Sequence, residues 1–136
     1  MIITFATQKG GTGKTTLAIA FANYISAISE RKIKVYDFDF QKSFYYKWKE
    51  DEQSDLPKLY EVETIGEDKE QPFSDFETLI NLKDSDEINL FDLAGTLDQK
   101  YSDLLIYSDF IIIPLDRKST RLNSSHLKLS RMPSSA

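Results

Sequence analysis

The segment from Gln8 to Thr16, QKGGTGKTT, combines glycines, lysines and hydroxyl residues between an apolar run and a stretch with helical periodicity. Glycines allow backbone N–H groups to close around phosphate oxygens, and the N-terminus of the following helix adds a favourable dipole. In such a loop Lys14 can reach the β- and γ-phosphates of a nucleotide, and the hydroxyl of Thr15 suits Mg²⁺. The general pattern G-x-x-x-x-G-K-[ST] fails at one position, because Gln8 stands where it has its first glycine. We therefore predict a phosphate-binding loop of an unusual type, with a second lysine at Lys9.

Acidic residues follow two other apolar segments. In YDFDFQKS, Asp37 and Asp39 come at the end of a predicted strand, and in INLFDLAG the predicted strand leads into Asp92. Open α/β sheets bind their ligands at the carboxyl ends of the strands, and residues i and i+2 of an extended segment point to the same side. Many buried strands end in Asp, so the second segment gains weight only from its position after the other two motifs. We predict that the three carboxylates serve the ligand of the loop.

These motifs must be positioned by the elements around them. Apolar runs and period-two patterns predict strands, and apolar residues at i, i+3 and i+4 predict helices. The predicted strands are 2–6, 34–38, 59–65, 88–91 and 110–114, with helices at 16–28, 41–50, 72–82 and 98–107. The alternation of strand and helix predicts an α/β fold with a doubly wound, mostly parallel sheet, similar to that of the P-loop NTPases.

The loop QKGGTGKTT resembles the deviant Walker A motif of the ParA/MinD ATPases, in which the extra lysine, here Lys9, is the signature residue. The resemblance implies that Lys14 serves the protein's own nucleotide, whereas Lys9 reaches the phosphates of the other subunit in an ATP-sandwiched dimer. A second cation offsets the negative charge that develops during phosphoryl transfer. By the same resemblance, the nucleotide contacts of the loop come from Gly10, Gly11, Thr12, Gly13, Lys14, Thr15 and Thr16.

The two acidic segments also resemble motifs of this family. YDFDFQKS is similar to D-x-D-P-Q-x-S, which implies that Asp37 holds Mg²⁺ through water and that Asp39 orients or deprotonates the attacking water. INLFDLAG resembles a Walker B segment, which implies that Asp92 holds a Mg²⁺-bound water and that the N–H of Gly95 approaches the γ-phosphate. The implied metal ligands are then Thr15, Asp37 and Asp92, and the implied catalytic residues are Lys9, Lys14 and Asp39.

The resemblance implies an ATPase that binds Mg·ATP, forms a homodimer around it and hydrolyses it slowly under stimulation by a partner. The implied process is the partition of plasmid, chromosomal or mobile-element DNA, with non-specific DNA and a ParB-like adaptor as partners. Other branches share the loop. A MinD-like positioning ATPase and an iron–sulfur carrier therefore stay open as alternatives, and so does a non-hydrolytic regulator.

Composition and charge divide the chain of 136 residues unequally. It contains no cysteine and no apolar stretch that could span a membrane, so we expect a cytoplasmic protein with no membrane partner. Residues 116–136 carry a net charge of +4, which leaves −9 for residues 1–115 out of the overall −5. This tail resembles the conceptual translation of a sequencing adapter, and we expect it to be non-native and disordered.

The expected native part is then 1–115, the N-terminal part of a ParA-like ATPase domain. On this interpretation the domain is truncated, its parent protein is longer, and the fragment itself is inactive. Two other features favour structural roles. The aromatic run Phe44–Trp48, interspersed with lysine, is more typical of a helix packed on a sheet than of base stacking, and Asp109 suits a simple strand start.

Overall fold

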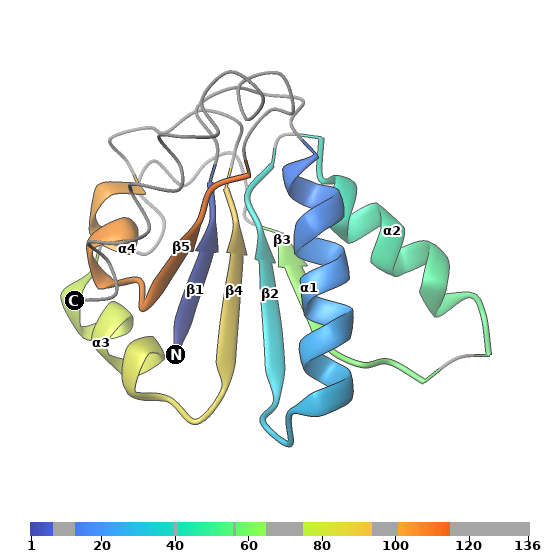
Figure 1. Ribbon diagram of the computed structural model, residues 1–136, viewed down its shortest axis with the longest axis horizontal. Helices are drawn as coiled ribbons and strands as arrows, with labels where there is room; N and C mark the ends of the chain where they lie inside the picture. Colours follow the sequence, from blue (N-terminus) through green and yellow to red (C-terminus); the bar gives the residue numbers. More distant parts are fainter. Residues whose placement is uncertain (7–12, 40, 56, 65–74, 94–100, 115–136) are drawn as a thin grey trace, which may run out of the picture.

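The computed structural model describes residues 1–6, 13–39, 41–55, 57–64, 75–93 and 101–114. Strands and helices alternate along these residues (Figure 1). The strands are β1 (Ile2–Phe5), β2 (Ile33–Asp37), β3 (Glu61–Thr64), β4 (Ile88–Asp92) and β5 (Phe110–Ile112). The helices are α1 (Lys14–Ile28), α2 (Ser43–Glu52), α3 (Phe76–Asp84) and α4 (Ser102–Tyr107).

The described strands form one parallel sheet in the order β3-β2-β4-β1-β5. The chain leaves β1 towards β2 on one side, and β5 later joins β1 on the other side. A reversal of this kind opens a crevice at the carboxyl ends of the strands. The register pairs both Phe5 and Asp37 with Asp92, so the ends of β1, β2 and β4 are level. The acidic strand ends and the chain that leaves β1 therefore meet at the same edge.

Helices cover both faces of the sheet, because successive strand residues point to opposite sides. In Figure 1, α1 lies in front of the sheet near β2, while α3 and α4 lie on the opposite side of the molecule from α2. The cluster beneath α1 and α2 buries Ile3, Phe5, Ala18, Ala22, Ile33, Val35, Phe44, Val62, Ile88 and Leu90. The cluster beneath α3 and α4 buries Ile2, Ala6, Tyr36, Phe38, Leu79, Phe91, Leu93, Tyr101 and Leu104.

The predicted α/β class and parallel sheet are confirmed, while several element bounds were wrong by a few residues. The helix predicted from residue 16 begins at Lys14, because the carbonyl of Gly13 already accepts the N–H of Leu17 at 3.0 Å. The helix predicted from residue 72 begins at Phe76, because Asp75 is extended and its carboxylate caps the N–H of Thr78.

Three other predicted elements differ in the same way. Helix α2 runs from Ser43 to Glu52, so it begins and ends two residues later than the predicted range 41–50. Helix α4 begins at Ser102 rather than at residue 98, and residues 98–100 lie outside the described part. Strand β5 ends at Ile112, two residues before the predicted end.

Candidate functional site

The N-terminus of α1 meets the carboxyl end of β4. Lys14 is the first residue of α1; its side chain is buried, and its Nζ forms an ion pair with Oδ1 of Asp92. The hydroxyl of Thr15 donates a hydrogen bond to the other carboxylate oxygen, Oδ2, at 3.0 Å. Both oxygens of Asp92 are therefore held by the first two residues of the helix, and Asp92 is the counter-ion of Lys14 in this structure.

Gly13 sets the entry into this helix. It adopts φ 78° and ψ 16°, in the left-handed region, and it is the N-cap residue of α1. A Cβ at this position would meet no atom within 4 Å, so glycine is required for its conformation rather than for space. The same backbone conformation costs other residues about 1–2 kcal/mol. The glycine predicted to belong to the phosphate loop is thus the residue that turns the chain into the helix bearing Lys14.

Asp37 lies beside Asp92 on the neighbouring strand, and both are almost fully buried. Its Oδ1 accepts the N–H of Asp39 and its Oδ2 accepts the N–H of Tyr45, each at 3.0 Å. Burial raises the pKa of Asp37 to about 6; the two N–H donors oppose this shift, and the charges of Asp92 and Asp39 add to it. The carboxyl edge therefore concentrates negative charge in a poorly solvated place.

The pKa of Asp92 is also raised by burial, but the neighbouring ammonium of Lys14 opposes the shift. Burial raises the pKa of Asp92, whereas the charge and hydrogen bond of Lys14 and the hydroxyl of Thr15 lower it; the net shift is upward. Asp39 is half-buried at the start of the turn after β2, and its Oδ1 accepts the N–H of Gln41 at 3.3 Å. Asp39 adds to the electrostatic repulsion at both buried carboxylates, so the three acids form one cluster.

The donor atoms at this edge fit Mg²⁺. This cation prefers oxygen ligands and is usually held by one or two carboxylates together with phosphate and water. Thr15, Asp37 and Asp92 supply a hydroxyl and two carboxylates of this kind. A bound cation would also offset the repulsion among the buried carboxylates, which contributes to the raised pKa of Asp37. Among the described residues, no group of three or more His, Cys, Asp or Glu side chains could hold a metal by itself.

The structure therefore brings together five of the residues predicted from the sequence: Gly13, Lys14, Thr15, Asp37 and Asp92, with Asp39 beside them. Thr16 lies exposed in the first turn of α1. The other predicted site residues, Lys9, Gly10, Gly11, Thr12 and Gly95, lie outside the described residues.

Sequence reasoning missed one contributor, the backbone of Tyr45. Its signal was its place in the first turn of α2, where N–H groups lack partners within the helix. Packing contacts are found at Asp109 and at Phe44, two residues of the features for which structural roles were predicted. Asp109 accepts the N–H of Ile2 and pairs with Lys83, and Phe44 is buried under the sheet. Tyr46 of the same aromatic run instead points outward, with 59% of its surface exposed.

Comparison with known families agrees with this geometry. A family described as the CobQ/CobB/MinD/ParA nucleotide binding domain matches residues 3–130. The chain belongs to this family, and it is a nucleotide-binding domain of the ParA/MinD type. The matched range ends within residues 116–136, whose adapter origin stays a prediction. A search among curated proteins gave no match. In the described part of the chain, no helix has the length and apolar character needed to cross a membrane.

Proposed function

We propose that this domain belongs to a ParA-like ATPase that binds Mg·ATP, dimerises around it and hydrolyses it in the partition of plasmid, chromosomal or mobile-element DNA. The observation that carries the proposal is the contact of Lys14 and Thr15 with Asp92, beside Asp37 on the neighbouring strand, at the carboxyl edge of a parallel sheet. A lysine and a hydroxyl at a helix N-terminus suit the phosphates, and the carboxylates suit the metal.

The chain's own residues would divide the work as follows. Lys14 would leave Asp92 for the β- and γ-phosphates, and the freed carboxylate of Asp92 would help to hold the metal. Thr15 and Asp37 supply the remaining protein oxygens, and bound Mg²⁺ would neutralise charge on the phosphates. Asp39 orients the attacking water. Asp37 holds the turn that carries Asp39 by accepting its N–H, so Asp37 also positions the residue that acts on water.

Nucleotide binding tests the first part of the proposal on this chain. Lys14→Ala should weaken the binding of a fluorescent ATP analogue about 10- to 100-fold, because it removes a charge-assisted contact to phosphate. Lys34→Ala is the matched control: it removes a lysine that pairs with Glu63 on the sheet, away from the loop, and should leave binding unchanged. Equal affinity in both variants would reject the assignment of Lys14.

Turnover tests the second part of the proposal. Asp39→Ala should keep nucleotide binding and lose hydrolysis, because its proposed target is the attacking water. Hydrolysis at the wild-type rate would show that Asp39 has another role.

The dimer proposal rests on Lys9. Lys9→Ala should bind ATP as a monomer but should not form dimers with a slowly hydrolysed ATP analogue. Sedimentation measures this directly, and equal dimer content in variant and wild type would remove the cross-subunit role.

The partition proposal further expects ATP-dependent binding of non-specific DNA and stimulation of turnover by a ParB-like adaptor. A protein that binds ATP but neither DNA nor an adaptor belongs to another branch of the family.

A further inference from the structure

A cavity of about 470 Å³ opens between α1, the C-terminal half of α2 and the segment that leads into β3. It is separate from the nucleotide site, because none of the residues of the carboxyl edge lines it. The described lining residues are Asn23, Trp48, Asp51, Glu52, Pro57, Lys58, Leu59 and Tyr60. The lining thus combines two aromatic side chains with two carboxylates.

Hydrogen bonds fix the aromatic walls. The indole N–H of Trp48 donates to the carbonyl of Tyr60 at 3.0 Å, and the hydroxyl of Tyr60 donates to Oδ1 of Asn23 at 2.9 Å. The ring of Tyr60 also meets the buried ring of Phe44 edge to face, with centroids 6.0 Å apart. These two walls are therefore tied to α1, α2 and the core.

The cavity already holds a cation from its own chain. Nζ of Lys58 lies 4.9 Å from the centroid of the Trp48 ring and 2.7 Å from Oε1 of Glu52. Nζ of Lys49 lies 5.6 Å from the same ring and 3.3 Å from Oε2 of Glu52. At Trp48 and Glu52 an aromatic face and a carboxylate thus act on the same ammonium groups.

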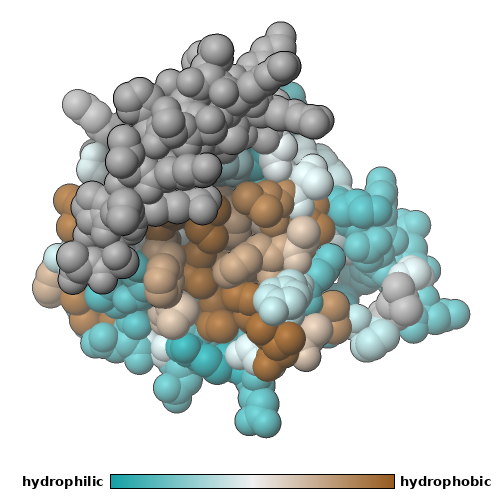
Figure 2. All heavy atoms as spheres, in the orientation of Figure 1, coloured by the Kyte–Doolittle hydropathy of each residue, from teal (hydrophilic) through white to brown (hydrophobic). Residues whose placement is uncertain are grey.

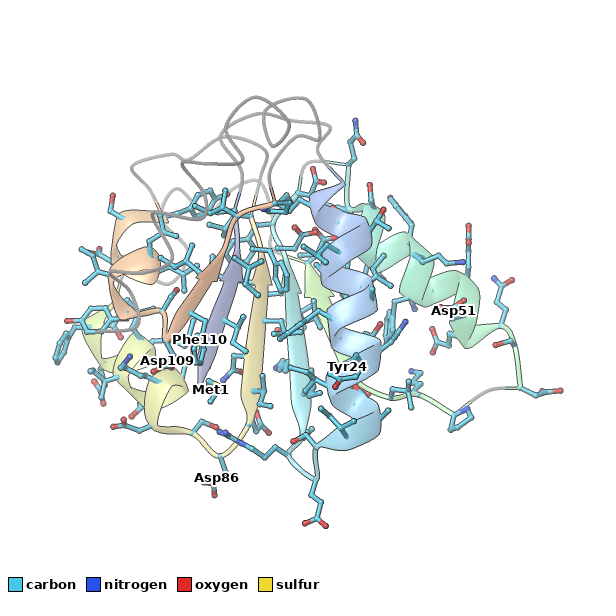
Figure 3. The ribbon with its side chains drawn as sticks, in the orientation of Figure 1. Met1, Tyr24, Asp51, Asp86, Asp109 and Phe110 are labelled. Atoms are coloured by element: carbon cyan, nitrogen blue, oxygen red, sulfur yellow. The ribbon has the colours of Figure 1, made fainter. Side chains whose placement is uncertain are left out.

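Asp51 adds a second carboxylate with little compensation. The ion pair found for it within the described residues is long, 3.8 Å to Nζ of Lys47 on the solvent side of the helix. Burial raises the pKa of Tyr60 to about 12, and the negative charge of Asp51 adds to this shift. The charge of Asp51 thus reaches the cavity wall. Figure 3 shows Asp51 on α2, far from the labelled Asp86 in the turn before β4.

We propose that this cavity binds an organic cation, an alkylammonium or guanidinium group on an apolar stem, in exchange for the ammonium of Lys58. The apolar walls Pro57, Leu59 and Trp48 would receive the stem, and Glu52 and Asp51 the charged head, as amphipathic basic side chains prefer. The net charge of −5 on the chain also favours the approach of a cation to this cavity. The proposal is independent of the function proposed for the nucleotide site.

The chain offers its own probe, because Trp48 is its only tryptophan. We would titrate the chain with 1,5-diaminopentane and with a blocked tripeptide that has a central lysine, and follow indole fluorescence. The matched neutral ligands are 1,5-pentanediol and the same tripeptide with norleucine. Both cations should bind several-fold more tightly than their neutral partners. Saturation by the diamine alone would identify a small-molecule site, and saturation by the lysyl peptide alone a site for a protein side chain.

Variants decide whether the proposed contacts carry the binding. Lys58→Met keeps an apolar stem but removes the internal cation, so affinity should rise about threefold to tenfold. Glu52→Gln and Asp51→Asn should each lower affinity by a similar factor. Asp86→Asn is the matched control: it makes the same change of charge at an exposed residue outside the cavity, and should have no effect.

Two outcomes would overturn the proposal. Equal binding of charged and neutral ligands would show an apolar cavity without cation selectivity. Unchanged affinity in Lys58→Met, with the native fold confirmed by circular dichroism, would show that the ligand does not take the place of Lys58.

Discussion

The two edges of the sheet, β3 and β5, differ in the residues that they expose to solvent. At the β3 edge, Val62 is buried beneath α2 while Glu61 and Glu63 point to the other side, where Glu63 pairs with Lys34 at 3.0 Å. Charged residues of this kind protect an edge strand from pairing with other chains. The β3 edge therefore has the composition of a strand that faces water.

The β5 edge has the opposite composition. Phe110, Ile111 and Ile113 are apolar, and between 43% and 57% of the surface of each is exposed. Phe110 stands beside Ile3 on the face that α1 covers elsewhere, yet in Figure 1 no described helix lies in front of β1 and β5. Figure 2 shows hydrophobic side chains gathered on this face of the molecule, and Figure 3 marks Phe110 there. The composition of β5 is that of an interior strand, which is apolar on both sides.

Matched phenylalanines test the contrast most strongly. Phe44→Ala, beneath the β2 and β3 side, should cost about 3–5 kcal/mol in the free energy of unfolding, because the ring is 1% exposed in the core. Phe110→Ala, at the β5 edge, should cost less than about 1 kcal/mol, because its ring is already 57% exposed. Urea unfolding of both variants measures the difference. A loss for Phe110→Ala as large as that for Phe44→Ala would mean that the face is covered in solution.

Asp37, at the end of β2, and Asp109, just before β5, should change the free energy of unfolding with pH in opposite directions. The pKa of Asp37 is raised to about 6 by burial, so its ionisation destabilises the fold. The free energy of unfolding should fall by up to about 3 kcal/mol as pH rises from about 4 to 6, and then level off. Burial alone would raise the pKa of Asp109 as well, but the N–H of Ile2 and Lys83 outweigh it and lower that pKa. Its contribution is present above the unfolded pKa of 3.8 and is lost as pH falls further.

Substitutions separate these two effects. Asp37→Asn should flatten the stability profile between pH 4 and 6, and Asp109→Asn should flatten it only below pH 4, when unfolding is measured across pH 3 to 7. An unchanged slope between pH 4 and 6 in Asp37→Asn would show that another group titrates there.

The two edge strands should also differ in their contribution to self-association, with a smaller expected effect. Ile111→Lys places a charge on the exposed side of β5 and should weaken concentration-dependent association several-fold in sedimentation velocity. Glu61→Lys introduces the same residue at the β3 edge, which is already polar, and should change association little. If both variants behave alike, net charge rather than the apolar edge controls association.

The smallest expected effect lies at the start of α2, the helix that covers β3. Lys42 has φ 51°, the one non-glycine residue with positive φ in the described part of the chain. Lys42→Gly should therefore raise the free energy of unfolding by at most about 1 kcal/mol, since the strain it removes is partly offset by the greater freedom of glycine when unfolded. Thermal unfolding can resolve such a change, and a clear loss of stability would mean that the lysine side chain makes a contact worth more than its strain.

The sequence predicted those features that depend on local pattern. Apolar runs located the strands, and the spacing of Lys14, Asp37 and Asp92 placed them at one edge because parallel strands end together. The sequence could not give the order of the strands, since it depends on which apolar faces pack. It also could not give the pairing of Lys14 with Asp92, 78 residues apart, or the bond from Tyr45 to Asp37, which needs the turn between β2 and α2. The start of α3 was missed because the Asp75 cap outweighed the apolar pattern.

The ion pair between Lys14 and Asp92 has a consequence for ligand selectivity. An anion that binds Lys14 must displace a buried carboxylate, so the binding energy available to it is reduced by whatever the pair contributes. A small anion with a single contact gains too little to overcome this threshold. A polyphosphate can contact Lys14, Thr15 and the helix N-terminus together, and it brings a cation for Asp92. These several contacts offset the free energy that is lost when Lys14 and Asp92 separate. We therefore expect the site to bind metal-bound nucleotides in preference to free phosphate and sulfate, because only the former compensate for displacing Asp92 from Lys14.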